Sequence, residues 1–434
     1  MSSKPAIGFC GLGAMGFGMA THLVKQGYTV TGFDVYGPTL ERFTKAGGQP
    51  ATTLAASAKD KLFYICMVAT AQQAQSALFD SEDSIVKSLP EGATLLLCST
   101  VPASYAQSVE KQLNDGGRSD IHFIDCPVSG GAIRAADGTL SIMAGASPAA
   151  IEKGKWLLDE LTAPSKLFIV EGGIGMGSNM KMAHQVLAAI QILATGEAFG
   201  FAARLGLDAK EVREKVVGSE AWSWMFENRS NRTLAEDFFP GASALGIILK
   251  DVGIITSMAR LTSFPLPLCT ISEQVYTSGH NLGLTPHDDA MMVRAYFPDP
   301  VFSVTSTLSS SEKEGKLKSV QDLLVGIHLV SAAESLAFAK FLGLPLAQLY
   351  ELAVDAAGGS TMFKEEGKLM IDVLEGKGGD GGRKIADVVD NLKKAVEEAQ
   401  KVRCPAYLGA GALNALLLGQ RKGEKASDVV RFWM

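Results

Sequence analysis

The chain has 434 residues, of which 47% are hydrophobic and 20% charged, enough for about two to four folded domains. Its formal net charge of −6 argues against a nucleic acid partner, because binding a phosphate backbone calls for a basic surface. The six Cys residues show no CxxC or Cys/His spacing, so we expect no metal site and reduced thiols in a reducing compartment.

The N-terminal stretch MSSKPAIGFCGLG reaches a predicted core strand almost at once. We therefore expect no signal or transit peptide. No apolar run looks as long as the roughly 18 residues that a membrane span requires. These features predict a cytoplasmic protein without a membrane partner.

Short β-branched or apolar runs alternate with amphipathic stretches up to about residue 170, which is typical of βαβ units on a parallel sheet. The strand candidates are AIGFCG (6–11), YTVTGFD (28–34), KLFYICMVA (61–69), GATLLLCS (92–99), IHFIDCP (121–127) and LSIMAGA (140–146). From about residue 172 the sequence is Ala- and Leu-rich with helical spacing. We predict a Rossmann-type α/β domain over residues 1–171, followed by an all-α region.

The first predicted strand runs into a GxGxxG pattern that opens a helix, and a second strand ends at Asp34. Such glycines allow a tight turn, approach of the backbone to a pyrophosphate, and close packing of helix on strand. The carboxylate of Asp34 suits ribose hydroxyls and disfavours a 2′-phosphate, so NAD is predicted over NADP. The predicted dinucleotide contacts here are Gly11, Leu12, Gly13, Ala14, Met15, Gly16 and Asp34.

Two further segments carry candidate substrate groups. Ser129, Gly130 and Gly131 follow a predicted strand, where backbone N–H groups beside a hydroxyl suit a carboxylate; a plain glycine-rich turn is an equal alternative. In GGIGMGSNMKMAHQ, helical spacing places Lys181, His184 and Gln185 on one face. Lys181 could relay a proton, although a solvated lysine and a core histidine are the ordinary readings of such residues.

The helical region contains an internal repeat. Residues 181–226 align without a gap on 318–363 after a shift of 137, with about 14 of 46 positions identical. A Pro- and Ser-rich linker over 295–315 separates the copies. The predicted helical domains are residues 172–300 and 312–434. Trp222, Trp224 and Phe226 are read as core residues, with a pocket wall as the alternative.

Four motifs in order resemble the β-hydroxyacid dehydrogenase family, which includes 3-hydroxyisobutyrate, tartronate semialdehyde and L-threonate dehydrogenases. They are GLGAMGFGM from Gly11, DCPVSGG with GTL over 125–140, GMGSNMK ending at Lys181 with one spacing residue fewer than usual, and Lys250-Asp251.

The resemblance implies an NAD-dependent hydroxyacid dehydrogenase in which Lys181 transfers the proton. It implies that Ser129, Gly130 and Gly131 hold the substrate carboxylate. It further implies nicotinamide-side contacts from Val68, Ala69 and Thr100, and a cofactor or substrate contact from Lys250.

The family usually has Asn where this chain has Gln185. Together with His184 this resembles the L-threonate dehydrogenase branch and favours a four-carbon sugar acid as substrate. The alternatives are oxidation of 3-hydroxyisobutyrate or reduction of a small aldehyde acid of the tartronate or succinic semialdehyde type. Imine reduction and a non-catalytic NAD-binding scaffold are disfavoured, because relatives of those kinds lose the lysine.

The duplication itself resembles 6-phosphogluconate dehydrogenase, in which the helical part is also doubled. In the second copy Lys318 persists, but His184 and Gln185 become Gln321 and Asp322. We therefore expect the second copy to supply packing that a partner subunit otherwise gives. The chain should then be a monomer or a homodimer, and the Lys-Asp pair is expected to drift to positions 393–394.

Overall fold

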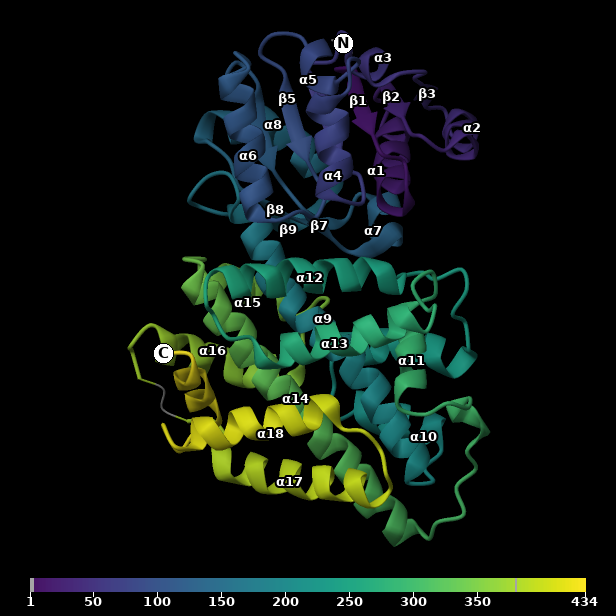
Figure 1. The fold of residues 1–434 in the computed structure, drawn as a ribbon, viewed down its shortest axis with the longest axis vertical. Coiled ribbons are helices and arrows are strands. Elements are labelled where there is room, and N and C mark those ends of the chain that lie inside the picture. Colours follow the sequence, from purple (N-terminus) through teal and green to yellow (C-terminus); the bar gives the residue numbers. More distant parts are fainter. Residues whose placement is uncertain (1–3, 379–380) are drawn as a thin grey trace. The chain divides into compact units, whose positions relative to one another are not determined.

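The computed structural model describes residues 4–378 and 381–434. The chain divides into two compact units, here called unit 1 (up to Lys181) and unit 2 (from Met182). Figure 1 shows unit 1 as an α/β domain and unit 2 as all-helical. The predicted α/β domain followed by a helical region is confirmed.

In the described part of unit 1, six parallel strands form one sheet in the order β3-β2-β1-β4-β5-β6. This is the strand order of a dinucleotide-binding fold, whose ligands lie at the carboxyl ends of the strands where the order reverses, here between β1 and β4. The strands are β1 (Ile7–Cys10), β2 (Val30–Phe33), β3 (Gln49–Pro50), β4 (Phe63–Cys66), β5 (Thr94–Leu97) and β6 (His122–Asp125).

Helices cover both faces of this sheet. One face packs through residues such as Phe9, Met19 and Leu157 against α1 and α8, and the other through Tyr64, Leu78 and others against α3 to α6. The helices of unit 1 are α1 (Ala14–Lys25), α2 (Gly37–Lys45), α3 (Leu54–Ala58), α4 (Ala71–Gln75), the π-helix η1 (Ser76–Asp80), α5 (Ile85–Ser88), α6 (Ala103–Asp115), α7 (Gly131–Asp137) and α8 (Pro148–Leu161).

A smaller sheet corrects one detail of the sequence prediction. The stretch LSIMAGA does not join the parallel sheet; it forms β8 (Leu140–Ala144) between an antiparallel β7 (Val128–Ser129) and a parallel β9 (Thr162–Ile169). Strand β9 was not predicted, because its sequence TAPSKLFI contains Pro, Ser and Lys and only two of its eight positions are buried.

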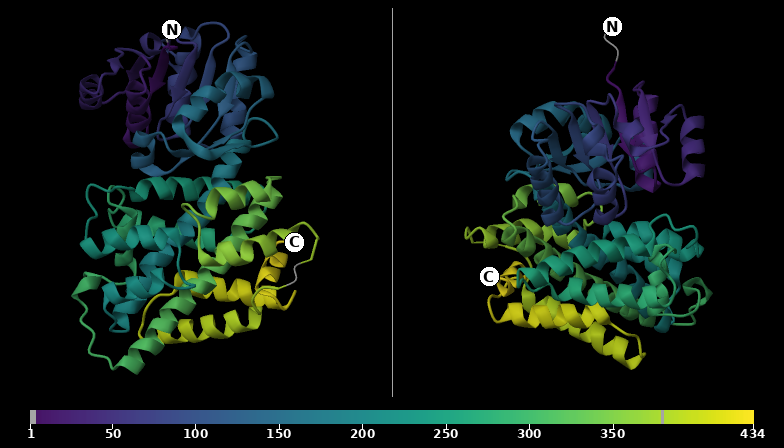
Figure 2. Two further views of the ribbon diagram at one scale, coloured as in Figure 1. Left: turned by 180° about the vertical axis from the view of Figure 1, so that it is seen from behind. Right: turned by 45° about the horizontal axis from the view of Figure 1, so that its top comes forward.

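The helices of unit 2 occur as two sets in the same order, seen from three directions in Figures 1 and 2. The first copy consists of α9 (Met176–Arg204), which begins in unit 1, then α10 (Ala209–Val217), α11 (Trp224–Ala235), α12 (Leu245–Leu261), α13 (Pro267–Asn281) and the 3-10 helix η2 (Asp289–Ala295). The second copy consists of α14 (Ser310–Phe341), α15 (Leu346–Ala353), α16 (Thr361–Leu374), α17 (Ile385–Lys401), α18 (Tyr407–Gln420) and η4 (Ala426–Phe432).

The segment between the copies contains one 3-10 turn, η3 (Val301–Ser303), among its described residues. Helix α14 begins within the predicted linker, where Ser309 and Glu312 form a reciprocal capping box.

Reciprocal backbone bonds join the copies at equivalent positions. The N–H of Trp224 donates to the carbonyl of Gly359 (2.9 Å), and the N–H of Thr361 donates to the carbonyl of Trp222 (3.1 Å). The 137-residue shift exchanges these two bonds, which is what a two-fold relation between the copies produces. Phe226, two residues further on, stacks on Phe199 in the core rather than lining an open wall.

Two buried glutamates at equivalent positions of the copies also form reciprocal hydrogen bonds that join the copies. Glu197 on α9 accepts hydrogen bonds from the N–H groups of Leu408 and Gly409, at the start of α18. Glu334 on α14 accepts from the N–H groups of Leu268 and Cys269, at the start of α13. Each copy thus caps a helix of the other copy. Burial raises the pKa of Glu197 to about 7 and that of Glu334 to about 8, against the lowering effect of these bonds.

Helices α9 and α14 are long and apolar enough to cross a membrane by length and composition, contrary to the sequence expectation. Their most apolar windows are 100% and 94% buried inside the structure, as in the core helices of soluble proteins. All six Cys residues are buried and without disulfides, in agreement with their reading as small buried hydrophobes.

Candidate functional site

The glycine-rich turn after β1 fits a dinucleotide. Gly11 has φ +90°, and a Cβ there would lie 2.2 Å from the carbonyl oxygen of Met67. A Cβ on Gly16 would lie 1.9 Å from the carbonyl oxygen of Gly11, so only glycine lets α1 approach the strand. A Cβ on Gly13 would meet nothing within 4 Å, and among the described residues no side chain caps the start of α1. The exposed N–H groups of this helix start can therefore receive a pyrophosphate.

Asp34 stands at the end of β2, beside the same turn. Its carboxylate accepts hydrogen bonds from the N–H of Leu12 (2.7 Å) and the N–H of Tyr36 (2.8 Å). These bonds fix its orientation and leave further lone pairs on both oxygens for a ribose diol. Tyr36 and Val35 beside it are exposed, and the following helix begins with Gly37-Pro38 rather than with a cation.

The predicted nicotinamide-side residues follow β4 and β5, the strands next to the reversal point. The N–H of Val68 donates to Ser99 Oγ (2.8 Å), which connects the two loops, and the N–H of Ala69 donates to Gln73 (3.0 Å). Thr100 comes directly after Ser99. Within unit 1 these loops lie along the carboxyl edge of the sheet together with the glycine turn.

Ser129 ends β7, and Gly130 and Gly131 follow with φ of +138° and +73°. Gly131 opens α7, and a Cβ on it would meet nothing within 4 Å. This turn lies at the end of a strand with accessible backbone, as a carboxylate site requires, but the geometry also suits an ordinary turn.

Asp125 is the first residue of the DCPVSGG motif, and the structure gives it a definite position. It ends β6, is fully buried, and accepts bonds from Gly175 N–H (3.2 Å), Ser178 N–H (2.8 Å) and Ser178 Oγ (2.7 Å). Burial raises its pKa to about 6, although those three donors favour the ionised form. The start of α9, and with it Lys181, is thereby fixed to the main sheet of unit 1.

Close backbone contact strengthens this attachment. A Cβ on Gly177 would lie 2.4 Å from the carbonyl oxygen of Asp125 and 2.5 Å from that of Met143. The first turn of α9 can pack here only because the GMG sequence has no side chain at this point. Lys181 follows one turn later and is largely buried, with 6% of its surface exposed.

In unit 2 the structure brings Gln185 and Lys250 together through Asp251. Gln185 Nε2 donates to Asp251 Oδ2 at 2.6 Å, and Lys250 Nζ lies 3.1 Å from Asp251 Oδ1. Asp251 itself is buried. The sequence indicated Lys250 as a contact to cofactor or substrate and missed Asp251 as the residue that binds both side chains. The Lys250-Asp251 motif was the available signal.

His184 contacts the second copy. Its Nε2 lies 2.5 Å from the carbonyl oxygen of Ala357, and since a carbonyl can only accept, Nε2 carries the proton. Two similar bonds lie nearby: Gln191 Nε2 donates to the carbonyl of Gly358 (2.6 Å), and Ser335 Oγ donates to the carbonyl of Ala183 (2.8 Å). The second copy therefore fixes the part of α9 that carries His184 and Gln185, which sequence reasoning did not predict.

Two family models match almost the whole chain. The NAD-binding domain of 6-phosphogluconate dehydrogenase matches residues 6–181. The model described as NAD-binding of NADP-dependent 3-hydroxyisobutyrate dehydrogenase matches two segments, 175–296 and 315–433.

Among curated relatives, L-threonate dehydrogenase of Pectobacterium atrosepticum is 34% identical over 68% of this chain and 95% of its own length. The Escherichia coli K12 L-threonate dehydrogenase is 32% identical over 67% of this chain and 94% of its own. The 2-hydroxy-3-oxopropionate reductase of the same strain is 29% identical over 67% and 96%.

A 3-hydroxyisobutyrate dehydrogenase structure from Salmonella typhimurium superposes with a TM-score of 0.62 at 30% identity, covering 68% of this chain and all of that one. The 6-phosphogluconate dehydrogenase of Plasmodium falciparum reaches 0.66 over 96% of both chains at 15% identity, which shows a common fold alone. The chain is thus a hydroxyacid dehydrogenase with a nicotinamide dinucleotide as cofactor, and it belongs to the 3-hydroxyisobutyrate dehydrogenase-like family.

Proposed function

We propose that the enzyme oxidises a small 2- or 3-hydroxy acid, with a four-carbon sugar acid such as L-threonate favoured, and uses NAD. The observation that carries the proposal is the attachment of Lys181: Asp125 and the Gly177 contact hold the first turn of α9 against the sheet that bears the dinucleotide turn. A group that transfers a proton must be held in place, and a solvated surface lysine would need no such attachment.

The turn from Gly11 to Gly16 and Asp34 would hold the dinucleotide, which would supply the hydride acceptor when bound; the other residues bind the substrate and move its proton. Lys181 takes the hydroxyl proton of the substrate as the carbinol carbon is oxidised, and returns a proton in the reverse direction. The N–H groups at Ser129, Gly130 and Gly131 bind the substrate carboxylate. Gln185, oriented by Asp251, and His184 would hydrogen-bond the further hydroxyls of the substrate.

The choice of a four-carbon acid rests on Gln185 and on the relatives. The longer amide reaches further than the Asn usual in the family, and two relatives at 32% and 34% identity are L-threonate dehydrogenases. Oxidation of 3-hydroxyisobutyrate and reduction of a small aldehyde acid remain the alternative reactions, the latter favoured by the likeness to a 2-hydroxy-3-oxopropionate reductase. A cytoplasmic location and a monomeric or homodimeric state belong to the same proposal.

A panel of acids with NAD, followed by NADH absorbance, tests the substrate. We expect L-threonate to give the highest kcat/KM, with 3-hydroxyisobutyrate at least tenfold lower. A preference for 3-hydroxyisobutyrate, or for an aldehyde acid with NADH, would replace the proposed substrate by that alternative.

The Lys181→Met variant tests the mechanism. Loss of the proton-transfer group should lower kcat by on the order of 10² to 10⁴, while the Kd for NAD changes little. Lys153→Met, at an exposed position on α8, is the matched control and should leave both values unchanged. A Lys181→Met enzyme within about threefold of wild type would contradict the assigned role.

A further inference from the structure

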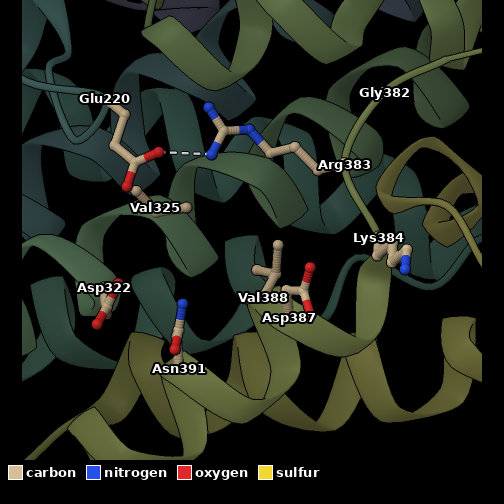
Figure 3. A pocket seen from close by; sticks show the side chains of 9 residues that line it. All are labelled: Glu220, Asp322, Val325, Gly382, Arg383, Lys384, Asp387, Val388 and Asn391. Carbon is tan, nitrogen blue, oxygen red and sulfur yellow. Dashed lines mark hydrogen bonds and ion pairs between the residues drawn. The ribbon is translucent and has the colours of Figure 1, made fainter.

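Unit 2 contains a pocket that is lined, apart from Glu220 of the first copy, by residues of the second copy (Figure 3), and we call it the second-copy pocket. Its volume is about 360 Å³, near the lower end of the range for small-molecule sites. It lies between α14, the start of α17 and the segment that precedes α11. The lining residues are Glu220, Asp322, Val325, Gly382, Arg383, Lys384, Asp387, Val388 and Asn391.

This pocket stands where the repeat places the counterpart of the Gln185–Asp251 cluster. The 137-residue shift relates Asp322 on α14 to Gln185 on α9. Helices α12 and α17 have 17 residues each, and Asp251 and Asn391 occupy the same position in them. The Lys-Asp pair therefore corresponds to positions 390–391 and not to 393–394. The amide and the carboxylate have exchanged places between the two copies.

Part of the pocket is an ion-pair network. Arg383 donates to Glu220 at 2.5 Å, and Lys318, the counterpart of Lys181, pairs with Asp322 and lies 4.0 Å from Glu220. A lysine committed to two carboxylates is not available for proton transfer. If every polar side chain of the pocket belonged to this network, the pocket would have no group available to bind a ligand.

The network leaves two polar side chains unused. The side chains of Asp387 and Asn391 form no hydrogen bond or ion pair with another residue in the described part of the chain, although their backbones belong to α17. Figure 3 shows both rising from α17 toward the space beside the Glu220–Arg383 pair, with Val388 between them. The open groups are thus a carboxylate that accepts and an amide that both donates and accepts. Beside them, the exposed Lys384 supplies positive charge, whereas Arg383 is already paired with Glu220 and Glu365.

We propose that the second-copy pocket binds a small polyhydroxylated carboxylic acid without converting it. Ligand hydroxyls would donate to Asp387 and exchange hydrogen bonds with Asn391, while the ligand carboxylate would lie against the exposed Lys384. A purely anionic ligand is disfavoured by the three carboxylates, and an apolar ligand by the unpaired polar groups. Only a short segment, 296–309, precedes α14 in place of a nucleotide-binding domain, so this pocket has no hydride acceptor. The ligand class rests on the proposed function; the pocket does not.

Binding of L-threonate to the full-length enzyme in the absence of NAD tests the proposal, by calorimetry and by difference density in soaked crystals. We expect two equivalents for the wild type and ligand density beside Asn391. Asn391→Leu, which keeps the side-chain volume and removes the amide, should bind one equivalent and keep kcat and KM. Asp387→Asn, at an exposed position, should weaken the second equivalent by about tenfold or more and serves if the first variant folds poorly.

Gln185→Leu is the matched variant in the first copy, and it separates this proposal from the proposed function. Gln185→Leu should lose turnover but still bind one equivalent of L-threonate, in the second-copy pocket. The double variant Gln185→Leu with Asn391→Leu should bind none. If L-threonate proves not to be a substrate, one equivalent in wild type that disappears in Asn391→Leu still supports the pocket. Binding that is the same in wild type and Asn391→Leu would leave an ion-pair network only and overturn the proposal.

Discussion

Replacing Glu334 by Gln should remove a defined part of the pH dependence of stability. The carboxyl of Glu334 is fully buried and its pKa is raised from 4.5 to about 8 by burial, against the effect of the Leu268 and Cys269 N–H donors. Because the folded-state pKa lies above the unfolded one, the folded protein retains this proton up to a higher pH. Its contribution is fully present below about pH 4.5 and is lost as the pH rises through about 8.

The magnitude follows from linkage at about 1.36 kcal/mol for each unit of pKa difference. Between pH 5.5 and pH 8.5, a rise of the Glu334 pKa from 4.5 to about 8 should lower the free energy of unfolding by about 3 kcal/mol. The same arithmetic for Glu197, with its pKa raised to about 7, gives about 2 kcal/mol. The Gln variants cannot ionise, so each should lack its own share of this decrease.

The measurement is urea-induced unfolding at the two pH values, with the fluorescence of Trp222 and Trp224 reporting on unit 2. The result to compare is the change between the two pH values, because Gln also places an amide opposite a backbone donor and lowers stability at every pH. Glu214→Gln, at an exposed position on α10, is the matched control and should behave like wild type. An unchanged pH response in Glu334→Gln would mean that the helix start keeps the carboxylate ionised throughout and would refute the reasoning.

Two further predictions concern the cofactor and the second copy. Asp34 should make kcat/KM higher with NAD than with NADP, by a ratio that corresponds to a few kcal/mol. Asp34→Ser should reduce that ratio by at least tenfold. An equal or higher kcat/KM with NADP in the wild type would contradict the role of Asp34. Lys318→Met should leave kcat and KM unchanged. Deletion of 312–434 removes the hydrogen-bond partners of Glu197 and His184, so it should cause aggregation or obligate dimerisation, as seen by light scattering. A soluble, active and monomeric remainder would show that the first copy needs no partner.

The features that the sequence predicted well are those encoded over a few neighbouring residues. The glycine pattern from Gly11 to Gly16 and the acid at the end of β2 have their meaning within one βαβ unit, because the turn and the helix start are local structures. Helical spacing likewise placed Lys181 and Gln185 on one face of α9. The strands of the main sheet were predicted from apolar runs, since strands buried on both faces need such runs.

What only the tertiary structure decided depends on residues far apart in the chain. Asp125 reaches Ser178 across 53 positions, Gln185 reaches Asp251 across 66, and Glu197 reaches Gly409 across 212. A local pattern marks Asp, Gln or Glu only as polar, and their neighbours in sequence do not reveal that burial in a core will force each to find a partner. The two sets of helices could be recognised in the sequence, but which residues of one copy hold the helix starts of the other was settled only by packing. The repeat can be read from the order of the residues. Burial arises only when distant segments come together, and with it arise the hydrogen bonds that buried polar groups require.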